Sequence, residues 1–227
     1  MKKYCTNCGE EINKEICDCK KNIEENNKNT VLNYVSTSIN SIFEMIKRPT
    51  KTMKNFVNDK NYSLGLIIIS IYSIINGLLL LIISNKICNA YRPFFRRNYY
   101  MYSNDLSKYS ICLILLTFVA VILFACLLYF ILKKLFNYKV SFKNTLSLVA
   151  ISSSFDIIGG VVSIILVSIS MPLVIFLMII TKILFLINVY DGMDNLKEEI
   201  NKDTKGYIIV STFIFEILVF LVFSLFI

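Results

Sequence analysis

Apolar residues in this chain are gathered into long blocks rather than spread evenly along it. Residues 64–84 and 110–132 are runs of 21 and 23 residues that contain no charged side chain. Each run has about the 20 residues that a helix needs to cross the hydrocarbon core of a bilayer. Three further apolar blocks lie at residues 145–168, 171–190 and 207–227. The pattern predicts five transmembrane helices.

These blocks predict an all-α integral membrane protein. A spanning helix satisfies its own backbone hydrogen bonds, whereas a lone strand in lipid does not. Segments of about ten alternating residues, which are typical of a membrane β-barrel, are absent. Hydrophobic residues make up 56% of the 227 residues and charged residues only 18%, which excludes an ordinary soluble domain. The absence of histidine excludes Ser-His, Cys-His and His-metal chemistry.

The lysine and arginine residues predict the orientation. Twelve of them flank the blocks on the N-terminal side of the membrane: Lys47, Arg48, Lys51, Lys54, Lys60, Lys133, Lys134, Lys139, Lys143, Lys197, Lys202 and Lys205. Five lie on the other side, all in the first connection: Lys86, Arg92, Arg96, Arg97 and Lys108. Because positive charge collects on the cytoplasmic side, we expect the N-terminus in the cytoplasm and the C-terminus outside. The net charge of +8 therefore indicates membrane orientation, and no nucleic-acid partner is expected.

Four cysteines lie close together in residues 1–20. Cys5 and Cys8 form a C-x2-C knuckle, and Cys17 and Cys19 follow as a C-x-C pair. Four thiolates at this spacing are typical of a structural Zn²⁺ site, and four protein ligands leave no position for catalysis. Two disulfides are the alternative, but a cytoplasmic head lies in a reducing compartment. We therefore expect a small zinc ribbon that folds only with its metal and is able to dock a cytosolic protein.

Between this head and the first block lie two kinds of sequence. Residues 21–30 are rich in Asn, Lys and Glu and predict a flexible linker. Residues 31–63 contain apolar residues at helical spacing, interrupted at Lys47-Arg48-Pro49. Basic and apolar faces just before a span are typical of interfacial helices on an anionic leaflet. The alternative is helices that pack on the cytoplasmic ends of the bundle.

Three charged residues fall near the middle of predicted spans: Asp156, Lys182 and Glu216. The third and fourth blocks are joined by only a few residues, so they form antiparallel neighbours, and the 1.5 Å rise per residue places Asp156 and Lys182 at similar depth. An unpaired ion at the centre of a span costs at least about 2.5–3.5 kcal/mol, so we expect the two to pair. Glu216 would join the pair or stay protonated. Either the charges fix the helix register or they line an ion or proton path.

Three stretches carry a resemblance to a known family. They are IFEMIKRPTKTMKNF before the first block, SFKNTLSLVAISSSFDIIGG at the third, and LINVYDGMDNL at the end of the fourth. Residues 40–227 resemble the bacterial branch of the Yip1 family, which implies a five-helix membrane domain at 64–227 in the bacterial cytoplasmic membrane. The head resembles the short zinc ribbons fused to such proteins. No GTPase-contacting motif accompanies the resemblance, so a trafficking role does not follow from it.

Two functions remain at this stage. The first is a non-enzymatic membrane adaptor or organiser whose zinc ribbon binds a cytosolic partner or steadies the bundle. The second is a small transporter or ion and proton pathway that uses Asp156, Lys182 and Glu216, with a homo-oligomer completing the path. An intramembrane enzyme is disfavoured because the spans contain no histidine and no metal-like cluster.

Overall fold

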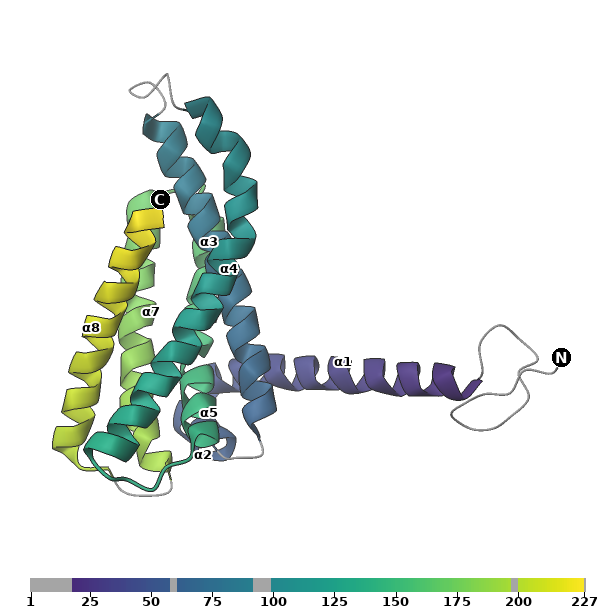
Figure 1. Ribbon diagram of the computed structural model, residues 1–227, viewed down its shortest axis with the longest axis vertical. Helices are drawn as coiled ribbons and strands as arrows, with labels where there is room; N and C mark the ends of the chain where they lie inside the picture. The colour runs from purple at the N-terminus through teal and green to yellow at the C-terminus, as the bar shows by residue number, and fades with distance from the viewer. Residues whose placement is uncertain (1–17, 58–60, 92–98, 197–199, 227) are drawn as a thin grey trace.

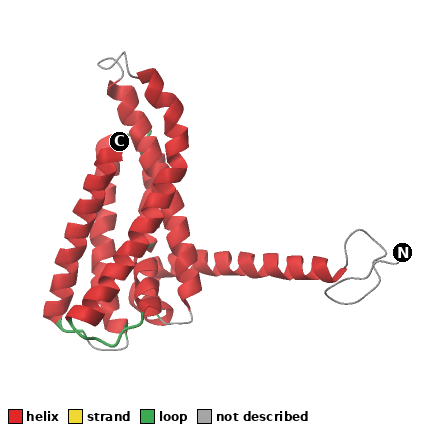
Figure 2. Cartoon of the chain, viewed as in Figure 1, coloured by secondary structure: helices red, strands yellow, loops and turns green. Residues whose placement is uncertain are grey.

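The computed structural model describes residues 18–57, 61–91, 99–196 and 200–226, which form helices joined by short connections (Figure 1). Strands are absent from these residues, so the all-α prediction is confirmed for them (Figure 2). In chain order the elements are α1 Asp18–Lys47, α2 Pro49–Phe56, α3 Tyr62–Tyr91, α4 Tyr99–Phe130, the π-helical turn η2 Ile131–Leu135, α5 Phe142–Ser152, α6 Ser154–Leu166, α7 Met171–Gly192, the 3-10 turn η3 Met193–Asn195 and α8 Lys202–Phe226.

Four helical segments in the described residues are long and apolar enough to cross a membrane. They are Tyr62–Lys86, Ile111–Leu135, Phe142–Leu166 and Met171–Asn195, each of 25 residues. They coincide with four of the five predicted spans. The fifth prediction, residues 207–227, falls on α8, where several side chains lie outside the described part of the chain. Figure 1 shows α8 running alongside α7.

The broken span made of α5 and α6 forms the centre of the bundle. In its most apolar window 67% of the residues are buried inside the protein, against 28–33% in the other three candidate spans. Helix α3 contacts α4, α5 and α6, and α7 contacts α5 and α6. The third span is therefore surrounded by protein, whereas the outer spans each keep a face for lipid.

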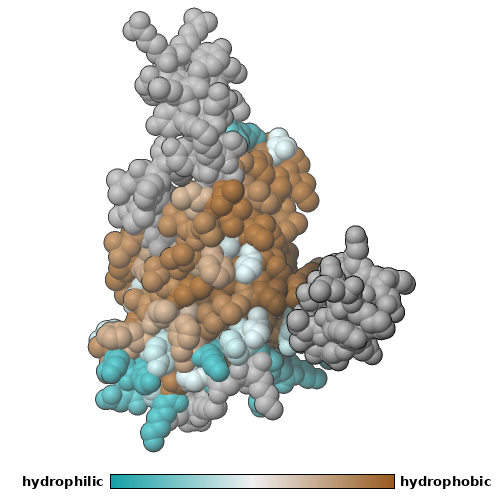
Figure 3. All heavy atoms as spheres, turned by 45° about the vertical axis from the view of Figure 1, so that its right-hand side comes forward, coloured by the Kyte–Doolittle hydropathy of each residue, from teal (hydrophilic) through white to brown (hydrophobic). Residues whose placement is uncertain are grey.

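Those outer faces are apolar. On α4 the exposed residues Ile111, Leu115, Val119 and Leu123 recur at four-residue spacing, as expected for one side of a helix. Exposed large apolar residues also cover α7 and the described part of α8. On the face drawn in Figure 3, hydrophobic residues cover the middle of the molecule and hydrophilic residues gather at its lower end. This distribution is consistent with contact between the bundle and a lipid bilayer.

Helix α2 packs on the end of the bundle. Arg48 leaves the helical conformation and Pro49 opens α2, as the Lys47-Arg48-Pro49 signal predicts. Met53, Phe56 and Val57 are buried, and α2 contacts α5 and α7. Of the two alternatives for residues 31–63, packing against the bundle therefore applies to α2. Helix α1 runs crosswise to the spans in Figure 1, and its buried residues Ser38, Ile42 and Met45 lie in its C-terminal half.

Residues 21–30 differ from their prediction as a flexible linker. They are continuous with α1, which begins at Asp18. The segment contains no glycine or proline, and lysine and glutamate are good helix formers. A low apolar content argued for a tether, but a polar segment with no helix breaker extends the helix that follows it.

Candidate functional site

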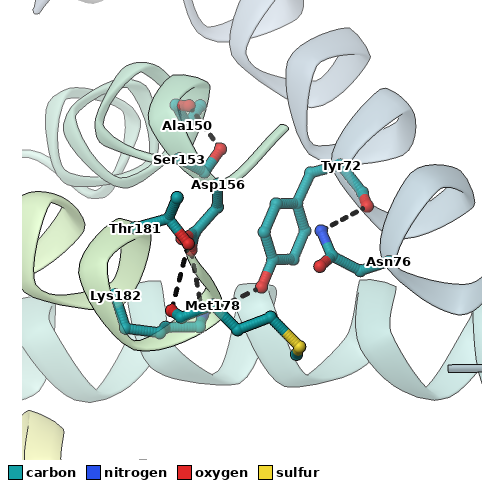
Figure 4. A network of polar contacts seen from close by, with 8 residues as sticks. All are labelled: Tyr72, Asn76, Ala150, Ser153, Asp156, Met178, Thr181 and Lys182. Atoms are coloured by element: carbon teal, nitrogen blue, oxygen red, sulfur yellow. Dashed lines mark hydrogen bonds and ion pairs between the residues drawn. The ribbon is translucent and has the colours of Figure 1, made fainter. Parts of the chain in front are cut away.

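The only ion pair within the candidate spans of the described residues joins α6 to α7. Lys182 Nζ lies 2.9 Å from Asp156 Oδ2. The two residues come from the neighbouring helices α6 and α7, and Figure 4 shows their side chains close together, as the depth arithmetic predicts. Asp156 is 3% exposed, whereas the Lys182 side chain is 37% exposed. The carboxylate is therefore enclosed by protein, and the lysine reaches it from the outer surface of the bundle.

Helix α3 completes the surroundings of the lysine. Lys182 Nζ donates a hydrogen bond to the Tyr72 hydroxyl over 3.2 Å. The same ammonium lies 5.6 Å from the centre of the Tyr72 ring and 5.4 Å from that of Phe185, within the range of cation–π attraction. A cation in hydrocarbon thus has a carboxylate, a hydroxyl and two aromatic faces around it. These contacts connect α3, α6 and α7.

The carboxylate lies just after a break in the third span. Between α5 and α6, Ser153 forms a turn with φ −72° and ψ −2°. Its hydroxyl donates to the Ala150 carbonyl over 2.7 Å, so a side chain competes for a backbone acceptor of the helix. The run Ser152-Ser153-Ser154 supplies this competition. The break places Asp156 in the first turn of α6, where the positive end of the helix dipole favours an anion.

Several buried polar atoms around the centre of the bundle have no hydrogen-bond partner among the described residues. They include Asp156 Oδ1 and the hydroxyls of Ser152, Ser154 and Ser163. An unpartnered polar atom in a protein interior costs about 1–3 kcal/mol. The third span therefore contains buried hydrogen-bonding atoms that its described hydrogen bonds do not satisfy.

Two glycines allow α6 to approach both of its neighbours. A Cβ atom on Gly159 would overlap the Thr181 side chain of α7. A Cβ atom on Gly160 would lie 2.7 Å from Ile75 Cγ2 of α3. Small residues at helix crossings permit this close approach in membranes. Asp156 is thus held within reach of Lys182 by the packing of its own helix.

Comparison with protein families decides the identity of the bundle. The Yip1 domain model matches residues 43–227, which include every described element from α2 onward. This chain belongs to the Yip1 domain family. Comparison with curated proteins and with solved structures gave no significant match. The Asp156–Lys182 pair therefore lies inside the Yip1 domain, and residues 1–42 precede it.

A second ion pair lies at the hydrophilic end of the Yip1 domain. Lys205 of α8 pairs with Asp194 of η3, and its ammonium lies 4.9 Å from the centre of the Tyr190 ring. Lys205 is buried, whereas Asp194 is exposed. Helix α7 ends at Gly192 and is followed directly by the 3-10 turn η3, which contains Asp194. This pair ties the start of α8 to the end of α7.

The remaining sequence-predicted site residues lie outside the described structure. Cys5, Cys8 and Cys17 precede Asp18, and the side chain of Cys19 is not among those described. No group of three or more metal-ligating residues occurs in the part of the chain that the structure describes. Glu216 belongs to α8, but the description does not include its side chain. The zinc ribbon and the contribution of Glu216 therefore stay predictions.

Two residues of this region do not stand out in the sequence. Tyr72, the hydrogen-bond partner of Lys182, lies within an apolar run, and Ser153, at the break before Asp156, lies within a predicted span. A tyrosine in mid-span has a polar tip that needs a partner when buried, and this was the available signal for Tyr72. Three consecutive serines were the signal for the break.

Proposed function

We propose that this chain is a non-enzymatic multi-pass membrane protein that acts as an adaptor or membrane organiser. Its Yip1 domain spans the bacterial cytoplasmic membrane five times, with α8 as the fifth span. A cytoplasmic zinc ribbon at residues 1–20, with a structural Zn²⁺ on Cys5, Cys8, Cys17 and Cys19, holds a cytosolic protein partner or steadies the bundle. The family match to residues 43–227 and the cysteine spacing ahead of it support this division of labour.

The surroundings of the central ion pair favour an adaptor over a transporter. Asp156 is buried, is paired with Lys182, and sits on a helix that Gly159 and Gly160 hold tightly against both neighbours. A charge that lines a water-filled path would be hydrated, whereas this carboxylate is enclosed. The pair therefore supports a structural role, in which complementary charges fix the register of α6 and α7.

The unpartnered atoms of the third span favour a second candidate, an ion or proton pathway. Asp156 Oδ1 and three buried serine hydroxyls would supply oxygen ligands beside a broken helix, the arrangement that many transporters use. Replacing both Asp156 and Lys182 by neutral residues separates the candidates. An adaptor keeps its partner in that variant, whereas a pathway that uses these charges loses transport.

The adaptor proposal predicts that metal and partner are lost together. The intact protein should contain about one zinc ion per chain, and Cys5→Ser with Cys8→Ser should remove it, because two ligands cannot hold a structural site. The variant should still insert, since the spans do not depend on the head. Zinc is measured by elemental analysis of the purified full chain, and the partner by crosslinking in cells followed by affinity capture.

Matched variants make this test specific. Cys112 and Cys126 are free and exposed on α4, so changing each to serine should leave zinc and partner unchanged. Undiminished zinc in the head variant would place the ligands elsewhere. A partner captured equally with and without zinc would contradict an adaptor that works through the ribbon.

The orientation gives a separate prediction. Topology reporters fused after Lys2 and at Asp194 should report the cytoplasm, and those at Asn98 and Ile227 the outside, because the positive charges favour this arrangement. Reporter activity and accessibility to a membrane-impermeant label check each position. A cytoplasmic Asn98 would reverse the orientation, and the head would then face an oxidising space in which disulfides replace zinc. Cytoplasmic Ile227 with external Asn98 would contradict a spanning α8.

A further inference from the structure

Helix α1 carries two neighbouring apolar stripes, and the bundle covers only one of them. Ile42 and Met45 are buried, together with Ser38, where α1 contacts α3, α5 and α6. The second stripe remains uncovered, with exposures between 40% and 65%, and consists of Leu32, Ile39, Phe43 and Ile46. These four residues recur at spacings of three, four and seven along the helix, so they share one side of it.

The uncovered stripe lies between the bundle and the polar side of α1. At about 100° per residue from the centre of the buried face formed by Ser38, Ile42 and Met45, Ile39 lies about 90° and Phe43 about 130° around the helix. Asn40 lies about 170° around it, and Glu44 follows on the far side. Asn40, Glu44 and Lys47 are exposed. A helix with one side on protein, one apolar side free and one polar side in water fits the boundary between a bilayer and the solvent.

The place of α1 in the molecule agrees with such a boundary. Figure 1 shows α1 leaving the bundle crosswise to the spans, near the end where Figure 3 shows hydrophilic residues. The spans from which α1 projects also carry exposed apolar faces that are suited to lipid. A helix that lay away from the membrane would leave this stripe in water.

Positive charge gathers where α1 turns into α2. Lys47, Arg48, Lys51 and Lys54 are all exposed, and no acidic residue lies between Lys47 and Asn58. Clusters of this kind next to a span are attracted to anionic headgroups by about 1 kcal/mol per charge, a factor of about five. The cluster adjoins Phe43 and Ile46 along the chain. The positive charges and the apolar stripe therefore both favour a lipid bilayer as the binding partner of α1.

We propose that residues 31–54 form a lipid-binding surface, in which Leu32, Ile39, Phe43 and Ile46 enter the acyl boundary and the basic corner binds anionic headgroups of the same bilayer. The occupant is lipid and not a second copy of the chain, because α1 projects crosswise from spans with exposed apolar faces and its stripe adjoins four exposed positive charges. In the orientation proposed above, this bilayer surface is the cytoplasmic leaflet. This lipid contact does not depend on the zinc ribbon or on its partner.

The absence of tryptophan from the sequence allows a direct test with a single reporter. Phe43→Trp places tryptophan on the free stripe, and Asn40→Trp, also at an exposed position, places it on the polar side as a matched control. The full chain is reconstituted in nanodiscs of phosphatidylcholine and phosphatidylglycerol whose acyl chains carry bromine. Because an interfacial helix lies about 5–10 Å into the boundary, bromine should quench the Phe43→Trp protein at least about twofold more than the Asn40→Trp protein, and acrylamide should do the reverse.

A charge variant tests the headgroup contact. In Phe43→Trp protein that also carries Lys51→Gln and Lys54→Gln, the docked-to-free ratio of α1 should fall by roughly fivefold per removed charge, and pure phosphatidylcholine should weaken docking in the parent. Equal bromine quenching at the two positions would overturn the proposal. A blue-shifted emission from the Phe43→Trp protein that bromine does not quench, with a dimer on sedimentation, would assign the stripe to a second copy and also overturn it. Ile39→Trp repeats the measurement at a second stripe position.

None of these outcomes bears on the adaptor role. Loss of lipid quenching with zinc-dependent partner capture intact would reject the lipid surface alone. Loss of zinc-dependent capture, with the tryptophan of the Phe43→Trp protein still quenched by lipid, would reject the adaptor alone.

Discussion

Lys182→Met is expected to destabilise the protein more than Asp156→Asn, although each substitution removes one half of the same ion pair. Removing the lysine strands a carboxylate that is only 3% exposed and whose Oδ1 already has no described partner. We expect a loss of about 3–5 kcal/mol in the free energy of unfolding, the range for breaking a buried pair. Removing the carboxylate leaves a lysine that is 37% exposed and that still contacts Tyr72 and Phe185. Such a side chain reaches toward a more polar surface, so the loss should be nearer about 2 kcal/mol.

The double variant Asp156→Asn, Lys182→Met should lose clearly less stability than the sum of the two single losses. It leaves no net charge in the span, and asparagine and methionine approximate the shapes they replace. A double-mutant cycle on reversible unfolding in lipid bicelles measures the coupling, which we expect at about 2–3 kcal/mol. Lys202→Met is the matched control, because this exposed lysine lies at the start of α8 and its loss should change stability by less than about 0.5 kcal/mol.

Additive losses would contradict the pairing of Asp156 with Lys182. Equal losses in the two single variants would contradict the unequal exposure of the two side chains. Either result would make Glu216 the next partner to test for Lys182 and would favour a polar path through the third span.

The position of this pair followed from the sequence because it depends on length alone. A short connection between two apolar runs makes them antiparallel neighbours, and a fixed rise per residue then sets the depth of Asp156 and Lys182. The approach of Tyr72 could not be found in this way. Which face of α3 turns toward α7 is decided by packing against α5 and α6, and an apolar run has no periodicity that shows it.

Tertiary packing also explains why α1 and α2, which have similar sequence patterns, bury their apolar residues differently. Both helices have apolar residues on one side and basic residues near Lys47-Arg48-Pro49. Amphipathic pattern alone does not distinguish burial against protein from burial in lipid, since both environments are apolar. In the structure α2 buries Met53 and Phe56 against the bundle, whereas Phe43 of α1 stays uncovered. The distinction depends on the crosswise direction of α1, which tertiary packing sets.

The glycines of α6 show why the sequence does not reveal which helices pack closely against each other. The pair Gly159-Gly160 indicates that another helix packs closely against α6. Only the structure identifies the neighbours as α7 and α3, through the positions of Thr181 and Ile75. Not every glycine of the chain has such a neighbour. Gly206 of α8 has no atom within 4 Å of the position that its Cβ would take.

Gly159→Ala should therefore destabilise the protein, whereas Gly206→Ala should stabilise it. The new methyl group at position 159 would overlap Thr181 and push α6 away from α7, which costs about 1–3 kcal/mol for an overpacked core and also lengthens the Asp156–Lys182 contact. At position 206 the methyl group meets open space, and alanine in a helix gains about 0.5–1 kcal/mol over glycine. Thr181→Ala removes the overlapping atoms, so the pair Gly159→Ala, Thr181→Ala should be little less stable than Thr181→Ala alone. Unfolding in bicelles measures all four variants under one condition. Wild-type stability in Gly159→Ala would show that α6 and α7 tolerate separation, and the ion pair could not then depend on their tight packing.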